Sequence, residues 1–315
     1  MTINWYPLVM QPIFHTRVWG GRRLETVMHK TLPDNQPYGE SWEMHDTTTV
    51  ANGPLAGQTL GDLVRQYGAE IIGPDNKTEE GMPLLVKILD ANDWLSVQVH
   101  PDDAQARHLE GDPRGKTEAW IVLAADAGSR LVIGMRPGTT QEAAAEAIKE
   151  GNLESLLVSV EVHEGDVLYI AANTIHALGP GVMIYEIQQS SDITYRMYDW
   201  NRLGLDGQPR PLHVDKALQV SSFGTIPTIH HTIMADGELL SGPYFVTWQH
   251  KLTGTPVSLA TDGHFHALTC IEGQIKVTAN EQTETLHTGQ TALVPAALDS
   301  FTLSGNGRVL RSFQP

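Results

Sequence analysis

The sequence is poor in cysteine: Cys270 is the single one among its 315 residues. One cysteine cannot form an intrachain disulfide or a zinc site built from cysteines alone. Such usage fits a reducing compartment, and we expect a cytoplasmic protein. Residues 1–14 hold no basic residue and no long apolar run, so no secretory signal is predicted. The sequence also lacks the run of roughly 18 apolar residues that a membrane span needs.

Basic residues are scarce as well. The sequence has 21 Lys and Arg against 37 Asp and Glu, which gives a formal net charge of −16. Nucleic acids and anionic membranes are bound mainly through Lys and Arg, so we expect neither as a partner. The hydrophobic content of 41% and the charged content of 18% are typical of a globular protein. The length suggests about two domains.

What the sequence does contain is a series of short segments rich in Val, Ile, Leu and Tyr, separated by glycine and proline. This spacing is typical of many strands joined by turns, so we predict a fold dominated by β-structure. The expected strands are 83–89, 95–100, 119–124, 130–135, 158–162, 167–171, 182–188, 244–252, 269–278 and 291–294.

Two segments, 59–72 and 139–157, have helical patterns instead. The first has its apolar residues on one stripe, and the second is rich in Ala and Glu. Each begins with a threonine, Thr59 or Thr139, followed three residues later by an acidic residue, which is the spacing of a capping box. Neither helix belongs to a repeating β-α-β pattern, so no doubly wound parallel sheet is expected.

A faint internal repeat relates residues 164–172 to residues 288–296. Both read as a turn glycine, a polar residue, an apolar strand and a corner made by alanine or proline. Two related β-barrels of jelly-roll type would explain the repeat. The second copy has no counterpart of His176, so we expect it to lack a metal site.

A change of composition at 221–228 predicts a linker. We therefore expect a first domain over residues 1–225, carrying the two helices, and a second, strand-rich domain over residues 226–315.

Candidate ligands occur in three of the predicted strands or their ends. In the segment 95–100, strict alternation places Gln98 and His100 on one strand face, where they could reach one ion. A strand face that carries polar residues is, by itself, more often a face exposed to solvent. Taken alone, Lys116 and Glu118 could be an ordinary solvated charged pair, and His176 could be a core histidine.

Together, however, these residues form a set of nitrogen and oxygen ligands. The set Gln98, His100, Glu118 and His176 suits Zn²⁺ best, with Fe²⁺ or Mn²⁺ possible. One anionic ligand would leave the site with a formal charge of +1, which makes a strong Lewis acid. Further along, the segment 185–200 is dense in polar and aromatic groups, with Glu186 on a strand and Arg196 in a turn.

In this order the motifs resemble those of type I mannose-6-phosphate isomerases (phosphomannose isomerases), in their short bacterial form. The resemblance covers most of the first 220 residues. The motifs are Trp19-Gly20-Gly21, Gly39-Glu40-Ser41-Trp42-Glu43, Val97-Gln98-Val99-His100-Pro101, Lys116-Thr117-Glu118-Ala119-Trp120, His176-Ala177-Leu178, and Ser190-Ser191-Asp192 through Arg196 to Tyr198-Asp199-Trp200. The resemblance implies a tandem cupin, an all-β fold of two jelly-roll barrels with a few helices.

The resemblance also implies a site. It places one zinc ion per chain on Gln98, His100, Glu118 and His176. It makes Arg196 the catalytic arginine, with Glu186 as a catalytic glutamate ten residues earlier.

The implied substrate is a sugar phosphate. The resemblance places its phosphate on Lys87 and Ser96, with Lys116 as a further cationic group in the pocket. Three departures stand out: Asn201-Arg202 replaces the family's usual Asp-Arg, Met44-His45-Asp46 replaces a run of small residues, and the C-terminal third matches loosely. The helical insertion of longer members is absent.

The implied reaction interconverts mannose 6-phosphate and fructose 6-phosphate through an enediol. It needs a base, and Glu186, a metal-bound water or a histidine could serve; Arg196 cannot, because its pKa is above ~12. One alternative is a non-catalytic metal-binding cupin that binds sugar phosphate. Another is a non-haem Fe(II) dioxygenase using His100, Glu118 and His176.

Overall fold

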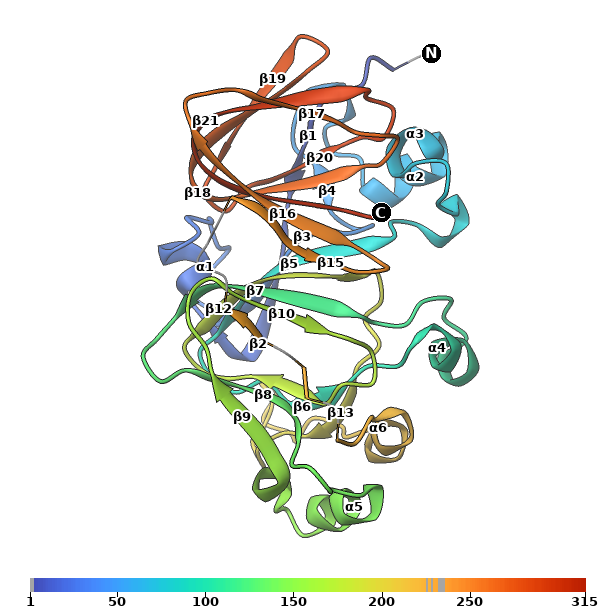
Figure 1. Ribbon diagram of the computed structural model, residues 1–315, viewed down its shortest axis with the longest axis vertical. Helices are drawn as coiled ribbons and strands as arrows, with labels where there is room; N and C mark the ends of the chain where they lie inside the picture. Colours follow the sequence, from blue (N-terminus) through green and yellow to red (C-terminus); the bar gives the residue numbers. More distant parts are fainter. Residues whose placement is uncertain (1–2, 225, 228, 232–235) are drawn as a thin grey trace.

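The computed structural model describes residues 3–224, 226–227, 229–231 and 236–315. Three antiparallel sheets make up most of the molecule, and a few short helices lie at its periphery (Figure 1). The prediction of a strand-dominated fold is confirmed. Among the described residues, no helix is long and apolar enough to cross a membrane.

Strands between residues 13 and 231 form two of the sheets, in the middle and lower parts of Figure 1. The seven-stranded sheet has the order β14 (Ile229–His231), β10 (Asp166–Ile170), β7 (Glu118–Ala125), β12 (Val182–Gln189), β5 (Leu84–Ala91), β2 (Ile13–Gly21) and β3 (Tyr38–Met44). The five-stranded sheet has the order β13 (Tyr195–Tyr198), β6 (Val97–Val99), β11 (His176–Leu178), β8 (Arg130–Met135) and β9 (Leu157–Glu161).

The third sheet contains most of the C-terminal strands, in the upper part of Figure 1. Its path is β15 (Gly237–Ser241), β16 (Val246–Thr253), β21 (Ser300–Phe313), β18 (His266–Ala279), β20 (Thr291–Val294), β1 (Leu8–Gln11) and β4 (Thr49–Val50). Two more strands extend it, with β17 (Val257–Ala260) beside β21 and β19 (Gln282–His287) beside β18. All ten predicted strand segments coincide with strands of these sheets.

Strand pairing crosses the predicted domain boundary in both directions. The N-terminal strand β1 pairs with β20, with Leu8 opposite Leu293. Conversely, β14, which lies after the predicted boundary, pairs with β10 of the predicted first domain. The division at residues 225 and 226 stays a prediction, and residues 225 and 228 of the predicted linker lie outside the described residues.

The helices are α1 (Arg23–Thr26), α2 (Leu60–Tyr67), α3 (Ala69–Ile72), α4 (Asp103–Glu110), α5 (Gln141–Lys149) and α6 (Val214–Val220), with 3₁₀ turns at Gly53–Leu55, Thr78–Glu80 and Leu153–Leu156.

The first predicted helix, 59–72, is present but broken. Gly68 has a φ of 53° and separates α2 from α3. Thr59 caps α2 by accepting a hydrogen bond from the backbone N–H of Asp62. The Asp62 carboxylate accepts from the Thr59 hydroxyl, not from its backbone, so only half of the capping box forms.

The second predicted helix, 139–157, is shorter than expected. It covers Gln141–Lys149, and its cap is Thr140, one residue after the predicted position. Gly151, with a φ of 69°, turns the chain out of the helix, and Leu157 already begins β9. The sequence reading missed α4, whose full capping box is formed by Asp102 and Gln105.

A buried polar seam joins the C-terminal sheet to the first half. The Lys30 ammonium lies 2.7 Å from Glu43 Oε1, with the two side chains 5% and 1% exposed. It also donates to the carbonyl of Gly289 at 2.5 Å, while Thr291 donates to Glu43 Oε2 at 3.2 Å. A carboxylate this deep is tolerated only because it is fully paired.

Lys30→Met should therefore lower the free energy of unfolding by about 3–5 kcal/mol, because it leaves Glu43 charged, buried and uncompensated. The matched control is Arg65→Met, since Arg65 and Asp62 form an ion pair with both side chains more than half exposed. That change should cost no more than about 1 kcal/mol. Urea unfolding of both variants decides the point. Equal losses would show that the seam pair adds nothing beyond a surface pair.

Candidate active site

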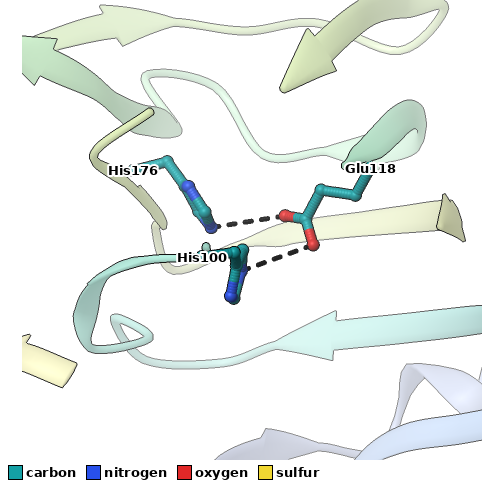
Figure 2. A group of neighbouring side chains, drawn as sticks. All are labelled: His100, Glu118 and His176. Carbon is teal, nitrogen blue, oxygen red and sulfur yellow. Dashed lines mark ion pairs between the residues drawn. The ribbon is translucent and has the colours of Figure 1, made fainter. Parts of the chain in front are cut away.

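Three buried side chains converge at the ends of three strands (Figure 2). His100 follows β6, Glu118 begins β7 and His176 begins β11. His176 Nε2 lies 3.3 Å from Glu118 Oε1, and His100 Nε2 lies 3.5 Å from Oε2. The potential ligand atoms all lie within 4.8 Å of one another, and each side chain is 1% exposed. His176 is buried, as a core histidine would be, but its ring also faces a buried carboxylate.

The protonation of the two imidazoles follows from their other ring nitrogens. His100 Nδ1 lies 2.8 Å from the carbonyl of Ile193, and His176 Nδ1 lies 2.9 Å from that of Thr174. A carbonyl only accepts, so each Nδ1 carries the proton. Burial lowers the pKa of His176, and burial with the nearby Lys116 charge lowers the pKa of His100 well below its ordinary value. Both rings are therefore neutral, and each Nε2 presents a lone pair.

The lone pairs of the two Nε2 atoms thus face the Glu118 carboxylate, which also can only accept hydrogen bonds. Burial alone would raise the pKa of Glu118, but the positive charge of Lys116 holds it well below its usual range. Two neutral imidazoles, each held at Nδ1 by a backbone carbonyl, and one carboxylate are a typical donor set for a divalent metal. The residues present fit such an ion.

Gln98 adjoins this cluster, because it is the cross-strand partner of His176. Its amide nitrogen lies 3.3 Å from His176 Nε2, and its amide oxygen accepts from the Ser96 hydroxyl at 3.3 Å. A metal would need the amide oxygen, so Gln98 can be a ligand only with its amide turned by half a rotation. The four predicted ligands therefore lie close together, but the amide oxygen of Gln98 is directed to Ser96 and not to the other three.

Lys116 is buried against the same groups. Its Nζ lies 3.0 Å from Glu118 Oε2 and 3.2 Å from His100 Nε2. Burial alone would lower the pKa of Lys116, but Glu118 and other carboxylates raise it above its ordinary value. The interpretation of Lys116 and Glu118 as a solvated surface pair is wrong, since both are buried.

A cavity of about 570 Å³ opens beside the cluster. Gln98, Lys116 and every other residue predicted for catalysis or phosphate binding contribute to its wall: Lys87, Ser96, Glu186 and Arg196. The residues predicted for the site thus lie around one cavity, on or next to strands of two sheets.

Glu186 lies on β12 between two fixed partners. The Trp120 indole donates to its Oε2 at 3.0 Å, and Lys87 Nζ lies 3.3 Å from its Oε1. Burial and the charge of Glu118 raise the pKa of Glu186 in spite of Lys87. Lys87 in turn lies 5.2 Å from the centroid of a Trp42 ring, a cation–π contact.

Arg196 lies on β13 and not in the predicted turn. It is the cross-strand partner of Gln98, which directs it to the cavity beside the metal cluster. Its Nη1 donates to the carbonyl of Pro211 at 2.8 Å, and its buried Nε has no hydrogen-bond partner among the described residues.

The sequence reading assigned no role to several residues of the cavity wall. Arg17 pairs with Glu40 at 2.7 Å, and Glu40 also accepts from the Trp42 indole at 2.8 Å. Burial would raise the pKa of Glu40, but Lys87 and Arg17 lower it to about 2. Glu40 belongs to the motif Gly39-Glu40-Ser41-Trp42-Glu43, so the sequence pointed to this residue as a candidate for the site. Arg17 and Arg210, which also line the cavity, stand in no recognised motif.

Comparison with known proteins agrees with this geometry. The family described as "Phosphomannose isomerase type I, catalytic domain" matches residues 8–118, and "Mannose-6-phosphate isomerase, cupin domain" matches residues 236–314. "Mannose-6-phosphate isomerase" of Streptococcus mutans is 33% identical, over 97% of this chain and 98% of its own. "Mannose-6-phosphate isomerase ManA" of Bacillus subtilis is 34% identical, over 95% and 96%.

A solved structure extends the match to the fold. The crystal structure of the mannose 6-phosphate isomerase from Bacillus subtilis superposes with a TM-score of 0.87 at 30% identity, covering 97% of this chain and 99% of that one. Family match, sequence identity over nearly the whole length and fold therefore agree: the chain belongs to the type I mannose-6-phosphate isomerase (phosphomannose isomerase) family.

Proposed function

We propose that this protein is a metal-dependent aldose–ketose isomerase that interconverts mannose 6-phosphate and fructose 6-phosphate through an enediol. One observation carries the proposal: a single cavity is lined by Lys87, Lys116, Glu186 and Arg196 and lies beside a buried His-Glu-His cluster. The matching relatives and the solved structure are mannose-6-phosphate isomerases by name.

The reaction moves a proton between C1 and C2 of the sugar. A base must take the carbon-bound proton from one carbon and return it at the other. Glu186 is our candidate, because it is buried in the cavity wall and its two oxygens are held by Trp120 and Lys87. His100 and His176 are poorer candidates, since their Nδ1 atoms are committed to backbone carbonyls and their Nε2 atoms to the cluster.

We assign one zinc ion per chain to Gln98, His100, Glu118 and His176. A bound zinc would supply Lewis acidity toward the oxygens on C1 and C2 of the sugar. The nitrogen-rich donor set supports zinc over magnesium or calcium, which prefer oxygen ligands.

Negative charge builds on the sugar oxygen as the enediol forms. Arg196 is our candidate for stabilising it, because it lines the cavity beside its cross-strand partner Gln98 and stays charged at neutral pH. Lys116 adds a second buried cation at the same end of the cavity.

The phosphate of the substrate is assigned to Lys87 and Ser96, which line the same cavity. The net charge of −16 repels a sugar phosphate at long range. Local cations in the cleft must therefore reverse the sign of the potential near the site.

For the fold, we propose a tandem cupin of two jelly-roll barrels, with the catalytic one over residues 1–225 and the other over 226–315. The cupin-domain match at residues 236–314 supports the second barrel. We assign it no metal, because His264 and His266 have no carboxylate partner among the described residues.

A non-catalytic sugar-phosphate-binding cupin would need the metal cluster but not a buried acid and a guanidinium aimed at the same space. Glu186 and Arg196 therefore favour the enzyme. The dioxygenase alternative leaves Lys87 and Ser96 without a role.

The first experiment is a coupled assay for fructose 6-phosphate formed from mannose 6-phosphate. We expect turnover by the purified protein, loss of turnover after chelation, and recovery on adding zinc. Turnover that survives complete metal removal would contradict the metal-dependent mechanism, and no turnover by metal-loaded protein would overturn the function.

Metal analysis checks the ligand assignment separately. Wild type should hold one metal per chain, and His100→Ala/His176→Ala should lose it, because two of the fixed nitrogen donors are gone. The control is His264→Ala/His266→Gln in the C-terminal half, which should keep one metal per chain. Full metal content in the first variant, or a second metal lost from the control, would refute the assignment.

Steady-state kinetics tests Arg196. Removing one preorganised donor to an oxyanion costs about 10²–10³ in kcat, so Arg196→Ala should lower kcat by that factor. KM should change by only about threefold, because the charge that Arg196 stabilises is absent from the ground state. A raised KM with kcat intact would instead make Arg196 a ground-state binding residue.

A further inference from the structure

The loop between β13 and α6, residues 199–213, forms part of the cavity wall. Gly204, Leu205, Asp206 and Arg210 of this loop line the cavity. They lie on the chain segment that directly follows the strand carrying Arg196. No role has been assigned above to any of these four residues.

The loop is held in a defined conformation. Trp200 and Asn201 have φ values of 58° and 54°, a strained arrangement for residues other than glycine. Trp200 is fixed by a tilted ring contact with Trp94, with centroids 4.8 Å apart, and by donating to the carbonyl of Leu95 at 2.6 Å. Further on, Gly204 N–H donates to the Gln208 carbonyl at 2.7 Å and closes a tight hairpin before Arg210.

Three arginines lie close together at the base of this loop. The buried Asp199 carboxylate accepts from Arg210 Nε at 2.7 Å and Nη2 at 2.5 Å, and from Arg202 at 3.0 Å. Arg196 contributes a third guanidinium nearby and contacts no carboxylate among the described residues. One buried carboxylate therefore faces more than one positive charge. Arg202 has a second partner, Asp93, but Arg210 has none among the described residues.

The cations elsewhere in the cavity wall are already compensated. Lys116 pairs with Glu118, Lys87 with Glu186, and Arg17 with Glu40. A sugar phosphate near neutral pH carries close to two negative charges, so Lys87 alone cannot neutralise it. Arg196 has no carboxylate partner among the described residues, and Arg210, which is close enough to lower the pKa of Arg196, brings a second guanidinium to the same part of the cavity wall.

We propose that Arg210 is a phosphate-binding residue that sets the preference for phosphorylated sugars, with Asp199 as the residue that positions it. This inference rests on the proposed isomerase function. Its guanidinium lines the cavity, and its remaining N–H groups suit the planar, charge-assisted recognition of a phosphate.

The strand register supports the same location. Val97 lies opposite Tyr198 in the pairing of β6 with β13, so Ser96 and Asp199 leave the ladder at the same end. Ser96, already assigned to the phosphate, is thus brought to the side of the cavity where Asp199 holds Arg210. The loop also brings the Asp206 carboxylate to the cavity wall, where it accepts from the Gln208 N–H at 3.0 Å.

The test compares Arg210→Met with Arg202→Met in the metal-loaded full chain. Arg202 shares Asp199 but does not line the cavity, so it controls for loosening of the loop. Binding of sorbitol 6-phosphate, an unreactive hexitol phosphate, is measured by calorimetry, and mannose 6-phosphate kinetics are measured in parallel.

Arg210→Met should weaken sorbitol 6-phosphate binding and raise KM by about 10- to 100-fold, the usual effect of losing a charged hydrogen bond to a ligand. Because the phosphate charge does not change during the reaction, kcat should stay within about threefold. Arg210→Lys should recover part of the binding, and Arg202→Met should stay within about threefold of wild type in both readouts.

Unchanged binding in Arg210→Met, or equal losses in Arg210→Met and Arg202→Met, would overturn the inference while leaving the isomerase function intact. Failure of the function itself has another signature: wild type would form no fructose 6-phosphate, whatever the calorimetry gives.

Discussion

The site depends on one unfavourable arrangement, in which a buried carboxylate faces two neutral imidazoles. Glu118 presents both oxygens to nitrogen lone pairs at 3.3 and 3.5 Å, and the backbone carbonyls behind His100 and His176 prevent either ring from turning its N–H toward the acid. Such a cluster is costly to bury unless positive charge lies at its centre. Lys116 supplies part of that charge from one side. The structure therefore carries a built-in requirement for a cation.

A second constraint is the separation of charge along the cavity. Beside the His100-Glu118-His176 cluster, the Lys116 cation is matched by the Glu118 carboxylate, so this part of the wall is polar but close to neutral. At the loop, Arg202 and Arg210 share the Asp199 carboxylate, and Arg196 close to them has no carboxylate partner among the described residues. A substrate with a polar, uncharged head and a dianionic tail would find complementary surroundings at both ends.

Much of this could be predicted from the sequence, for identifiable reasons. Alternation along 95–100 placed Gln98 and His100 on one face, and that local rule holds in any strand. Helix ends were harder, since Gly68 and Gly151 ended segments whose side-chain pattern continued. Arg210 could not be found at all. Its use depends on Asp199, eleven residues earlier, and on a loop whose path no periodicity encodes.

The motif Gly39-Glu40-Ser41-Trp42-Glu43 shows why the two halves of the molecule belong together. Strand alternation sends Glu40 and Trp42 toward the cavity, where Glu40 meets Arg17 and Trp42 meets Lys87. Glu43 points the other way and pairs with Lys30 in the seam. β12 repeats the pattern: Glu186 faces the cavity, while the Tyr185 hydroxyl lies 2.8 Å from that of Ser312 on the C-terminal sheet. The seam thus fixes the back of the strands whose front faces carry the site, and the C-terminal sheet packs behind them.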